Sequence, residues 1–260
     1  LYRRACLLVD HGGGRGYLLD LFRVRGGRTH DYLFHGPRER GRSAGPALRP
    51  RPQGWHDLTD AGDAAAAEPW SMVFDLDDRV RFAVHALPEE GETAIVGDGW
   101  GERGSTSRER GARAMKVPYV VRRREGDPAD SAFATVFDVS PASAPFVREV
   151  ARIEPRSGSG LAVLVRTPAS TDLVALCWDG GRAAFDTPVG RLERHGAAAA
   201  FSLSEGGRLE HGWLYAGPEA RLAAHRIALS RPLVGGAVAG MLTTNEESSY
   251  LLDGDALGAD

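Results

Sequence analysis

The feature that most constrains this fold is the shortness of its apolar segments, which turn residues interrupt throughout the chain. The sequence contains 33 glycines and 15 prolines. Between them lie short runs rich in leucine, β-branched and aromatic residues, such as Tyr17–Val24, Thr93–Val96 and Leu161–Val165. Such runs predict β-strands, and the helical signal at 64–68 is too short and is stopped by Pro69. We therefore expect an all-β protein, folded as an antiparallel β-sandwich.

The length of 260 residues is sufficient for two β units, each with its own core. The segment at 156–160, Arg-Ser-Gly-Ser-Gly, has the composition of a linker. We expect a β-sandwich region over residues 1–155 and a smaller C-terminal antiparallel β domain over residues 156–260.

Composition excludes several classes of protein. The net charge of -3 argues against a general nucleic-acid binder. No apolar run approaches the roughly 18 residues that cross a bilayer, so we expect no membrane partner. Cys6 and Cys177 lie far apart without a CxxC motif, which excludes a zinc ribbon. A single disulfide between them and two separate buried thiols both remain open, and we predict no metal site within this chain.

The segment Gly41–Gly45 fits the GxSxG pattern of serine hydrolases. That pattern works only where a buried strand enters the serine and a helix leaves it. Prolines at 46, 50 and 52 follow this segment and prevent a helix. A serine hydrolase is therefore excluded.

Candidate polar groups lie in the third strand-like segment, at 30–35. Strand alternation places His30 and Tyr32 on one face and His35 on the other. Neighbours two apart on one face are roughly 6 to 7 Å apart, so His30 and Tyr32 are candidates to contact one substrate, with His35 as a third candidate. The alternative is that these are surface or hydrogen-bonded residues of a sheet. Asp20 falls on the apolar side of its strand, where we expect a structural hydrogen bond.

Arginines are concentrated in two long loops. In the first loop we predict Arg38, Arg40 and Arg42 as substrate-binding residues, because guanidinium groups form bidentate bonds with carboxylates and sulfates. Trp55 is predicted to stack on a sugar ring, as Trp70 and Trp100 are able to do. The second cluster contains Arg103, Arg108, Arg110, Arg113, Lys116, Arg122, Arg123 and Arg124. The alternative for the arginines is that compositional bias places them in ordinary solvated loops. The alternative for the tryptophans is that they pack in the core or at its rim.

Two ordered stretches carry a family resemblance. The first comprises Tyr2–Arg4, Tyr17–Gly27 and His30–Gly36, and the second comprises Val117–Arg123 and Ser131–Phe137. Together they resemble the β-sandwich region of the heparinase II/III-like polysaccharide lyases. The resemblance covers about the first 150 residues and implies a sandwich of the super-sandwich type.

Members of that family join an N-terminal α/α toroid to C-terminal β-sheets and cleave uronate-containing polysaccharides, alginate-like or heparin-like, by β-elimination. Most of their catalytic groups lie in the toroid, and their zinc ligands, where present, lie upstream of the matched region. The resemblance thus implies that this chain is the β portion of a periplasmic or secreted lyase, inactive alone, with an acidic polysaccharide and the toroid of the same polypeptide as partners. The chain begins at Leu1 in strand-like sequence, so we expect the natural protein to begin upstream. The alternative is a non-catalytic carbohydrate-binding or structural β-sandwich module.

Overall fold

The computed structural model describes residues 1–37, 41–76, 79–101, 116–229, 239–243 and 250–252. Every regular element in these ranges is a β-strand, which confirms the all-β prediction. No helix in these ranges is long and apolar enough to cross a membrane. The chain divides into two compact units, Leu1–Phe146 and Val147–Asp260. The division precedes the predicted boundary at residue 155 because Glu149–Ile153 (β12) pairs with Leu161–Arg166 (β13).

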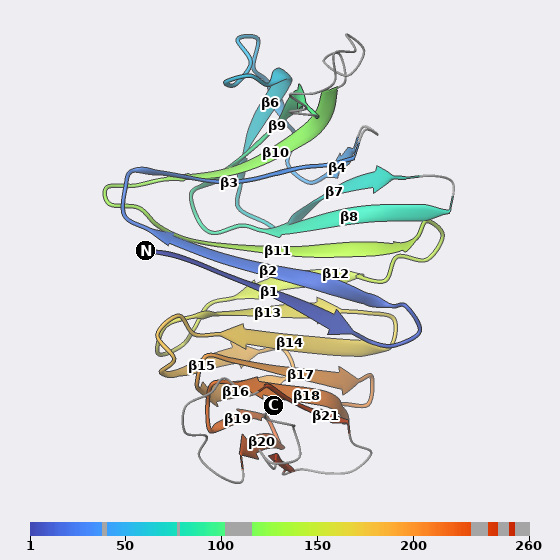
Figure 1. Ribbon diagram of the computed structural model, residues 1–260, viewed down its shortest axis with the longest axis vertical. Helices are drawn as coiled ribbons and strands as arrows, with labels where there is room; N and C mark the ends of the chain where they lie inside the picture. The colour runs from blue at the N-terminus through green and yellow to red at the C-terminus, as the bar shows by residue number, and fades with distance from the viewer. Residues whose placement is uncertain (38–40, 77–78, 102–115, 230–238, 244–249, 253–260) are drawn as a thin grey trace, which may run out of the picture. The chain divides into compact units, whose positions relative to one another are not determined.

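The first unit contains a six-stranded antiparallel sheet (Figure 1). Its strands in spatial order are β1 (Tyr2–Asp10), β2 (Gly16–Arg25), β11 (Asp130–Pro141), β8 (Val80–Leu87), β7 (Trp70–Asp75) and β4 (Arg42–Ala44). Residues 42–44, the centre of the GxSxG segment, are a strand paired with β7 rather than a turn into a helix.

A five-stranded antiparallel sheet forms the second layer of this unit. Its strands in spatial order are β3 (Thr29–His35), β10 (Lys116–Glu125), β9 (Glu92–Trp100), β6 (Thr59–Ala66) and β5 (Arg49–Pro50). Both sheets contribute to one apolar cluster, in which Trp70 and Phe74 of the first sheet pack with Ala94 and Val120 of the second. The two sheets therefore form a sandwich, and Trp70 is a core residue rather than a sugar-stacking one.

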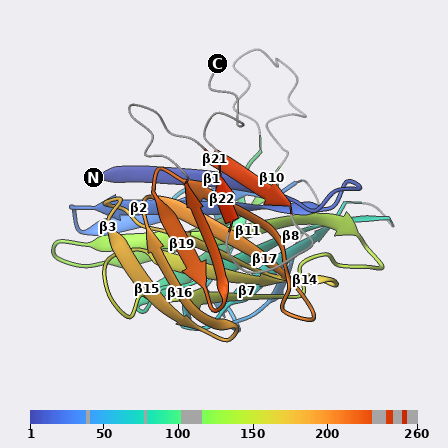
Figure 2. The ribbon, with the colours of Figure 1, turned by 90° about the horizontal axis from the view of Figure 1, so that it is seen from below.

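The second unit is also built from two sheets. In the first sheet the order is β12, β13, β14 (Ser170–Leu176), β17 (Ala198–Ser204), β18 (Leu209–Tyr215) and β21 (Ala239–Thr243). In the second sheet the order is β15 (Arg182–Thr187), β16 (Gly190–His195), β19 (Glu219–Leu222), β20 (His225–Leu229) and β22 (Tyr250–Leu252), with β15, β16 and β19 visible side by side in Figure 2. All neighbours are antiparallel except β20 and β22.

The core of the second unit lies between these two sheets. Phe201 and Leu173 of the first sheet pack in one cluster with Phe185, Leu192 and Leu222 of the second. The register sets Phe185, Leu192 and Leu222 directly opposite one another, so their side chains leave the same face of the sheet. The opposite face of this sheet is therefore available for polar residues.

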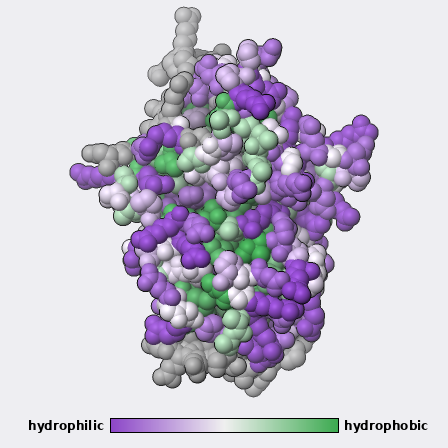
Figure 3. All heavy atoms as spheres, turned by 180° about the vertical axis from the view of Figure 1, so that it is seen from behind, coloured by the Kyte–Doolittle hydropathy of each residue, from purple (hydrophilic) through white to green (hydrophobic). Residues whose placement is uncertain are grey.

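The surface is mainly polar where it is visible in Figure 3, with smaller hydrophobic patches between hydrophilic side chains. Among the large apolar residues, Leu8 is 74% and Val139 59% exposed. Cys6 is exposed and Cys177 is buried, and both are free thiols. The disulfide, one of the two possibilities for the cysteines, does not form. The other expectation, two buried thiols, holds for Cys177 but not for Cys6, which is exposed.

Candidate functional site

The outer face of the five-stranded sheet carries the polar and aromatic groups that face away from the first unit's core. The pairing of β3 with β10 sets His35 opposite Tyr119 and Asp31 opposite Arg123. Residues opposite each other in a sheet point to the same side, so these four side chains share one face. The ring centroids of His35 and Tyr119 are 5.5 Å apart.

A short turn brings Trp55 onto this face. The backbone of Trp55 pairs with that of Leu58, and His56 between them has a φ of 49°, in the left-handed region. Leu58 packs on Ile95 and Val121 of the sheet, with Trp55 beside it. A Cβ atom at Gly99 would lie 2.7 Å from both the Leu58 and Tyr119 side chains, so this close approach depends on glycine.

Arg123 connects the turn to the sheet. Its Nε and Nη2 donate to the two carboxylate oxygens of Asp31 at 2.8 and 2.7 Å. Its guanidinium carbon lies 5.1 Å from the centre of the Trp55 ring, within the range of a cation–π interaction. The hydrogen bonds to Asp31 raise the pKa of Arg123, so the charge is firmly held. We call Asp31, His35, Trp55, Tyr119 and Arg123 the outer-face site.

Trp100 and Lys116 lie beside this site. The Tyr119 hydroxyl donates to the Trp100 carbonyl oxygen at 2.9 Å. Lys116 lies 6.0 Å from the Trp100 ring and donates to the Thr59 hydroxyl. Trp100 is 49% exposed, so its ring, unlike that of Trp70, is accessible to a ligand.

His30 and Tyr32, predicted as cleft residues, lie on the inner face of β3 and are only 5% and 4% exposed. Nε2 of His30 donates to the Gly26 carbonyl oxygen at 2.6 Å, because a carbonyl only accepts, and Nδ1 lies 2.9 Å from the Ser131 hydroxyl oxygen. Strand alternation separated these residues correctly from His35. It did not show that the six-stranded sheet covers them, where Phe22 and Phe133 pack with Tyr32, so in the structure both are packing residues of the core.

Asp20 has the structural role expected of it. Its buried carboxylate accepts two hydrogen bonds from Arg4, at 2.9 and 2.5 Å, and one from the Tyr32 hydroxyl at 2.8 Å. Burial, reinforced by the negative charge of Asp20, raises the pKa of Tyr32. Tyr32 is therefore held protonated at neutral pH and cannot act as a base there.

The predicted arginine surface is divided among several environments. Arg42 lies in β4, in the other sheet from the outer-face site, and donates to Asp75 at 2.7 Å. Arg38, Arg40 and residues 102–115 lie outside the described residues.

Arg122 is a further residue whose position differs from the sequence-based expectation. The sequence groups it with the second arginine cluster, which either attracts a polyanion or is solvated, but its side chain is fully buried beside that of Glu92. Its five N–H groups make five hydrogen bonds: two to Glu92 and one each to Leu87, Ala134 and Thr135. Because Glu92 and Arg122 belong to one sheet and the other three to the opposite sheet, Arg122 joins the two layers. The signal available was its alternation with Val120 in the strand.

The described groups of the outer-face site do not make up the set that β-elimination uses. β-Elimination needs a base, an acid and a group that neutralises the uronate carboxylate. Here the Arg123 guanidinium is already paired with the Asp31 carboxylate, and the Tyr119 hydroxyl already donates its hydrogen bond to the Trp100 carbonyl oxygen. His35 is the site's exposed imidazole, with Nδ1 3.2 Å from the Gly36 carbonyl oxygen. Within the described ranges no group of three or more His, Cys, Asp or Glu side chains lies close enough together to hold a metal ion.

Comparison with known proteins leaves the family resemblance as a prediction. No family model matches the chain, and no curated protein matches it.

Proposed function

We propose that this chain is the β portion of a polysaccharide lyase that cleaves a uronate-containing acidic polysaccharide, alginate-like or heparin-like, by β-elimination. The observation that carries the proposal is the placement of the segments that resemble the family. β2 and β11 pair with each other, and so do β3 and β10, although about a hundred residues separate each pair along the chain. The two stretches thus contribute one strand pair to each sheet, and Phe22, Tyr32 and Phe133 from them pack in one cluster between the sheets.

In this proposal the outer-face site lines one side of the substrate cleft. Trp55 offers a half-buried indole for a sugar ring, and His35 offers an exposed hydrogen-bonding group on the same face. The arginines of the first long loop, including Arg38 and Arg40, would supply positive charge for the uronate carboxylates. The sandwich also supports an N-terminal α/α toroid of the same polypeptide, and such an enzyme works in the periplasm or outside the cell.

The toroid supplies most of the chemistry in this account. The base, the acid and the neutralising group for β-elimination would come from it, and any zinc ligands would lie upstream of this chain. The chain alone therefore binds substrate without cleaving it. Arg123 and Tyr119, whose polar groups are engaged within the site, hold its shape.

The test is a lyase assay that follows the ultraviolet absorbance of the unsaturated uronate product. It compares this chain with the polypeptide in which its upstream region is joined to it, using alginate and heparin-type substrates. We expect product from the longer polypeptide alone. Product formed by the isolated chain would overturn the claim that it lacks catalytic groups. No product from the longer polypeptide with any acidic glycan would overturn the lyase assignment.

A second candidate is a non-catalytic carbohydrate-binding module. It is favoured because the polar groups of Arg123 and Tyr119 are already hydrogen-bonded within the site. The outer face then offers aromatic surface to a ligand, but not the base, acid and neutralising group that β-elimination needs. It predicts saturable glycan binding and no product even with the upstream region present. Under either candidate, charge reversal of Arg38, Arg40 and Arg42 to glutamate is expected to weaken polyanion binding. Unchanged binding would remove the arginine loop from both.

A further inference from the structure

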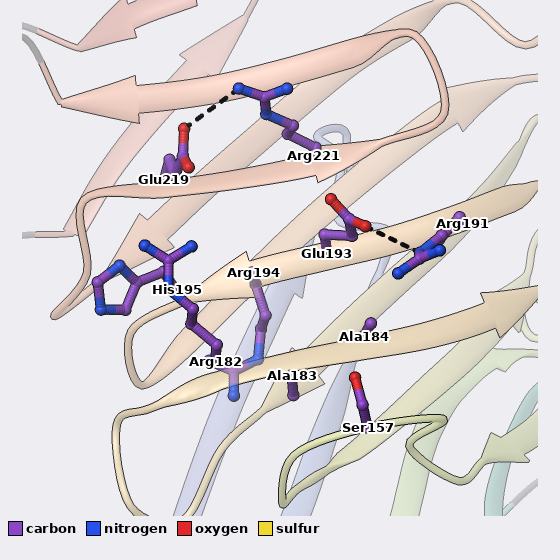
Figure 4. A pocket seen from close by; sticks show the side chains of 10 residues that line it. All are labelled: Ser157, Arg182, Ala183, Ala184, Arg191, Glu193, Arg194, His195, Glu219 and Arg221. Atoms are coloured by element: carbon purple, nitrogen blue, oxygen red, sulfur yellow. Dashed lines mark ion pairs between the residues drawn. The ribbon is translucent and has the colours of Figure 1, made fainter.

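The second unit contains a separate, positively charged pocket on the sheet formed by β15, β16, β19 and β20. Its volume is about 270 Å³. Figure 4 shows the charged side chains that line it, contributed by β15, β16 and β19. They are Arg182, Arg191, Glu193, Arg194, His195, Glu219 and Arg221. This pocket lies in a different unit from the outer-face site.

Strand register explains why these side chains gather. His195 lies opposite both Arg182 and Glu219, and Glu193 lies opposite Arg221. These residues alternate with Leu192, which belongs to the core, so they occupy the face of the sheet that points away from the core. Ser157 bridges to Ala184 and borders the pocket on one side.

The ion pairs within the pocket leave positive charge in excess. Arg191 pairs with Glu193 at 2.8 Å. Glu219 is shared, at 2.9 Å from Arg226 and 3.7 Å from Arg221, so Arg221 has no carboxylate at hydrogen-bonding distance in the described part of the chain. Among the described residues Arg182 makes no ion pair, although its charge, after those of Arg226 and Arg221, contributes to the lowered pKa of Glu219. Guanidinium N–H groups of Arg182 and Arg221 are therefore left to bind a ligand.

A buried charge adds to this potential from the core side. Arg194 is 3% exposed and leaves β16 toward the core, in the row of Ala183 and Ala220, and Figure 4 shows it extending toward Ala183 and away from Arg221. It donates to the Gly196 carbonyl, while its Nε and Nη2 have no hydrogen-bond partner within the described ranges. Burial lowers the pKa of Arg194 to about 10, so it remains charged at neutral pH.

We propose that this pocket binds a small oxyanion: a carboxylate, sulfate or phosphate group. Such groups accept paired hydrogen bonds from guanidinium groups, and an anion here would offset the charge that Glu193 and Glu219 do not balance. The volume is just below that of pockets for drug-sized molecules, about 300 Å³ and upward, which suits one charged group or one sugar residue. The proposal is independent of lyase activity.

The test is isothermal titration of the full chain with sodium sulfate, phosphate and glucuronate at constant ionic strength, with glucose as the uncharged control. We expect saturable binding of at least one oxyanion and none of glucose. Arg182→Ala and Arg221→Ala should each weaken binding about tenfold or more, because each removes charge-assisted hydrogen bonds to the anion. Glu193→Gln should tighten binding, because it removes negative charge from the pocket.

The matched control is Arg208→Ala, which removes an exposed arginine of the same unit outside the pocket, and it should leave binding unchanged. Binding of glucuronate alone would identify a uronate carboxylate as the source, and binding of phosphate or sulfate alone would identify a phosphorylated or sulfated ligand. The proposal is overturned if no oxyanion binds saturably, or if Arg208→Ala weakens binding as much as Arg182→Ala does.

Discussion

Replacing Arg122 with methionine should destabilise the first unit strongly. The substitution removes five hydrogen bonds and leaves the Glu92 carboxylate, whose side chain is fully buried, without its counter-charge. Breaking a buried ion pair from one side costs about 3–5 kcal/mol, because the remaining charge is neither solvated nor paired. We expect Arg122→Met to lower the free energy of unfolding by that amount.

A second substitution separates the charge from the packing. In the double variant Arg122→Met/Glu92→Leu no buried charge remains, so most of the loss should be recovered. The carbonyls of Leu87 and Ala134 still lose their arginine donor, which should leave a deficit of about 1–2 kcal/mol. The control is Arg28→Met, which removes an exposed arginine paired with Asp127 at 3.1 Å and should cost about 1 kcal/mol or less.

The assay is urea unfolding followed by circular dichroism and tryptophan fluorescence. The expected order of stability is wild type, then the Arg28 variant, the double variant and finally Arg122→Met. The reasoning is refuted if Arg122→Met costs no more than Arg28→Met, or if adding Glu92→Leu to it makes the protein less stable still.

Three further predictions concern stability. Burial, with a smaller contribution from the charge of Arg81, lowers the pKa of His85 from 6.5 to about 4. Between about pH 6.5 and pH 4 the unfolded chain therefore binds a proton at this histidine that the folded chain does not. The free energy of unfolding should therefore fall by up to about 3 kcal/mol as the pH falls through this window. In denaturation series measured at several pH values, His85→Phe should make the free energy of unfolding depend less on pH there. An unchanged pH dependence in the variant would contradict this prediction. Tyr32→Phe should cost about 1 kcal/mol in urea unfolding, because Asp20 keeps its two bonds to Arg4, and a loss above 3 kcal/mol would mean that Arg4 does not compensate. Phe185→Ala, in the core of the second unit, should cost about 3–5 kcal/mol and lower the thermal midpoint, whereas Tyr215→Ala, at a residue 41% exposed, should cost far less; equal losses would contradict the assigned core.

Strand content and face assignment could be predicted from the sequence because they depend on local pattern. The segment Tyr17–Val24 lies within β2, and the alternation of His30 and Tyr32 against His35 matches their burial. β6 is an instructive exception, since its alanine run at 64–66 gave a weak helical signal but forms a strand paired with β9. Pairing with a neighbouring strand overrides a short local propensity.

The sites depended on non-local information that a single sequence does not carry. Trp55 reaches Arg123 through a turn packed on β9 and β10, and the partner of Arg123 comes from β3. Arg122 and Arg123 are adjacent and chemically identical, yet one joins the two sheets in the core and the other lies on the outer face. Only the pairing register and the second layer distinguish them.

The central claim is that the outer-face site binds an acidic polysaccharide, and its most direct test is calorimetric titration of this chain with uronate oligosaccharides from alginate and heparin. The account predicts saturable binding that Trp55→Ala weakens about tenfold, equivalent to about 1.4 kcal/mol of lost aromatic contact. Trp213→Ala, which removes a half-buried tryptophan of the second unit, should leave the affinity unchanged. Absence of binding to either oligosaccharide, or equal weakening by the two tryptophan variants, would contradict the claim.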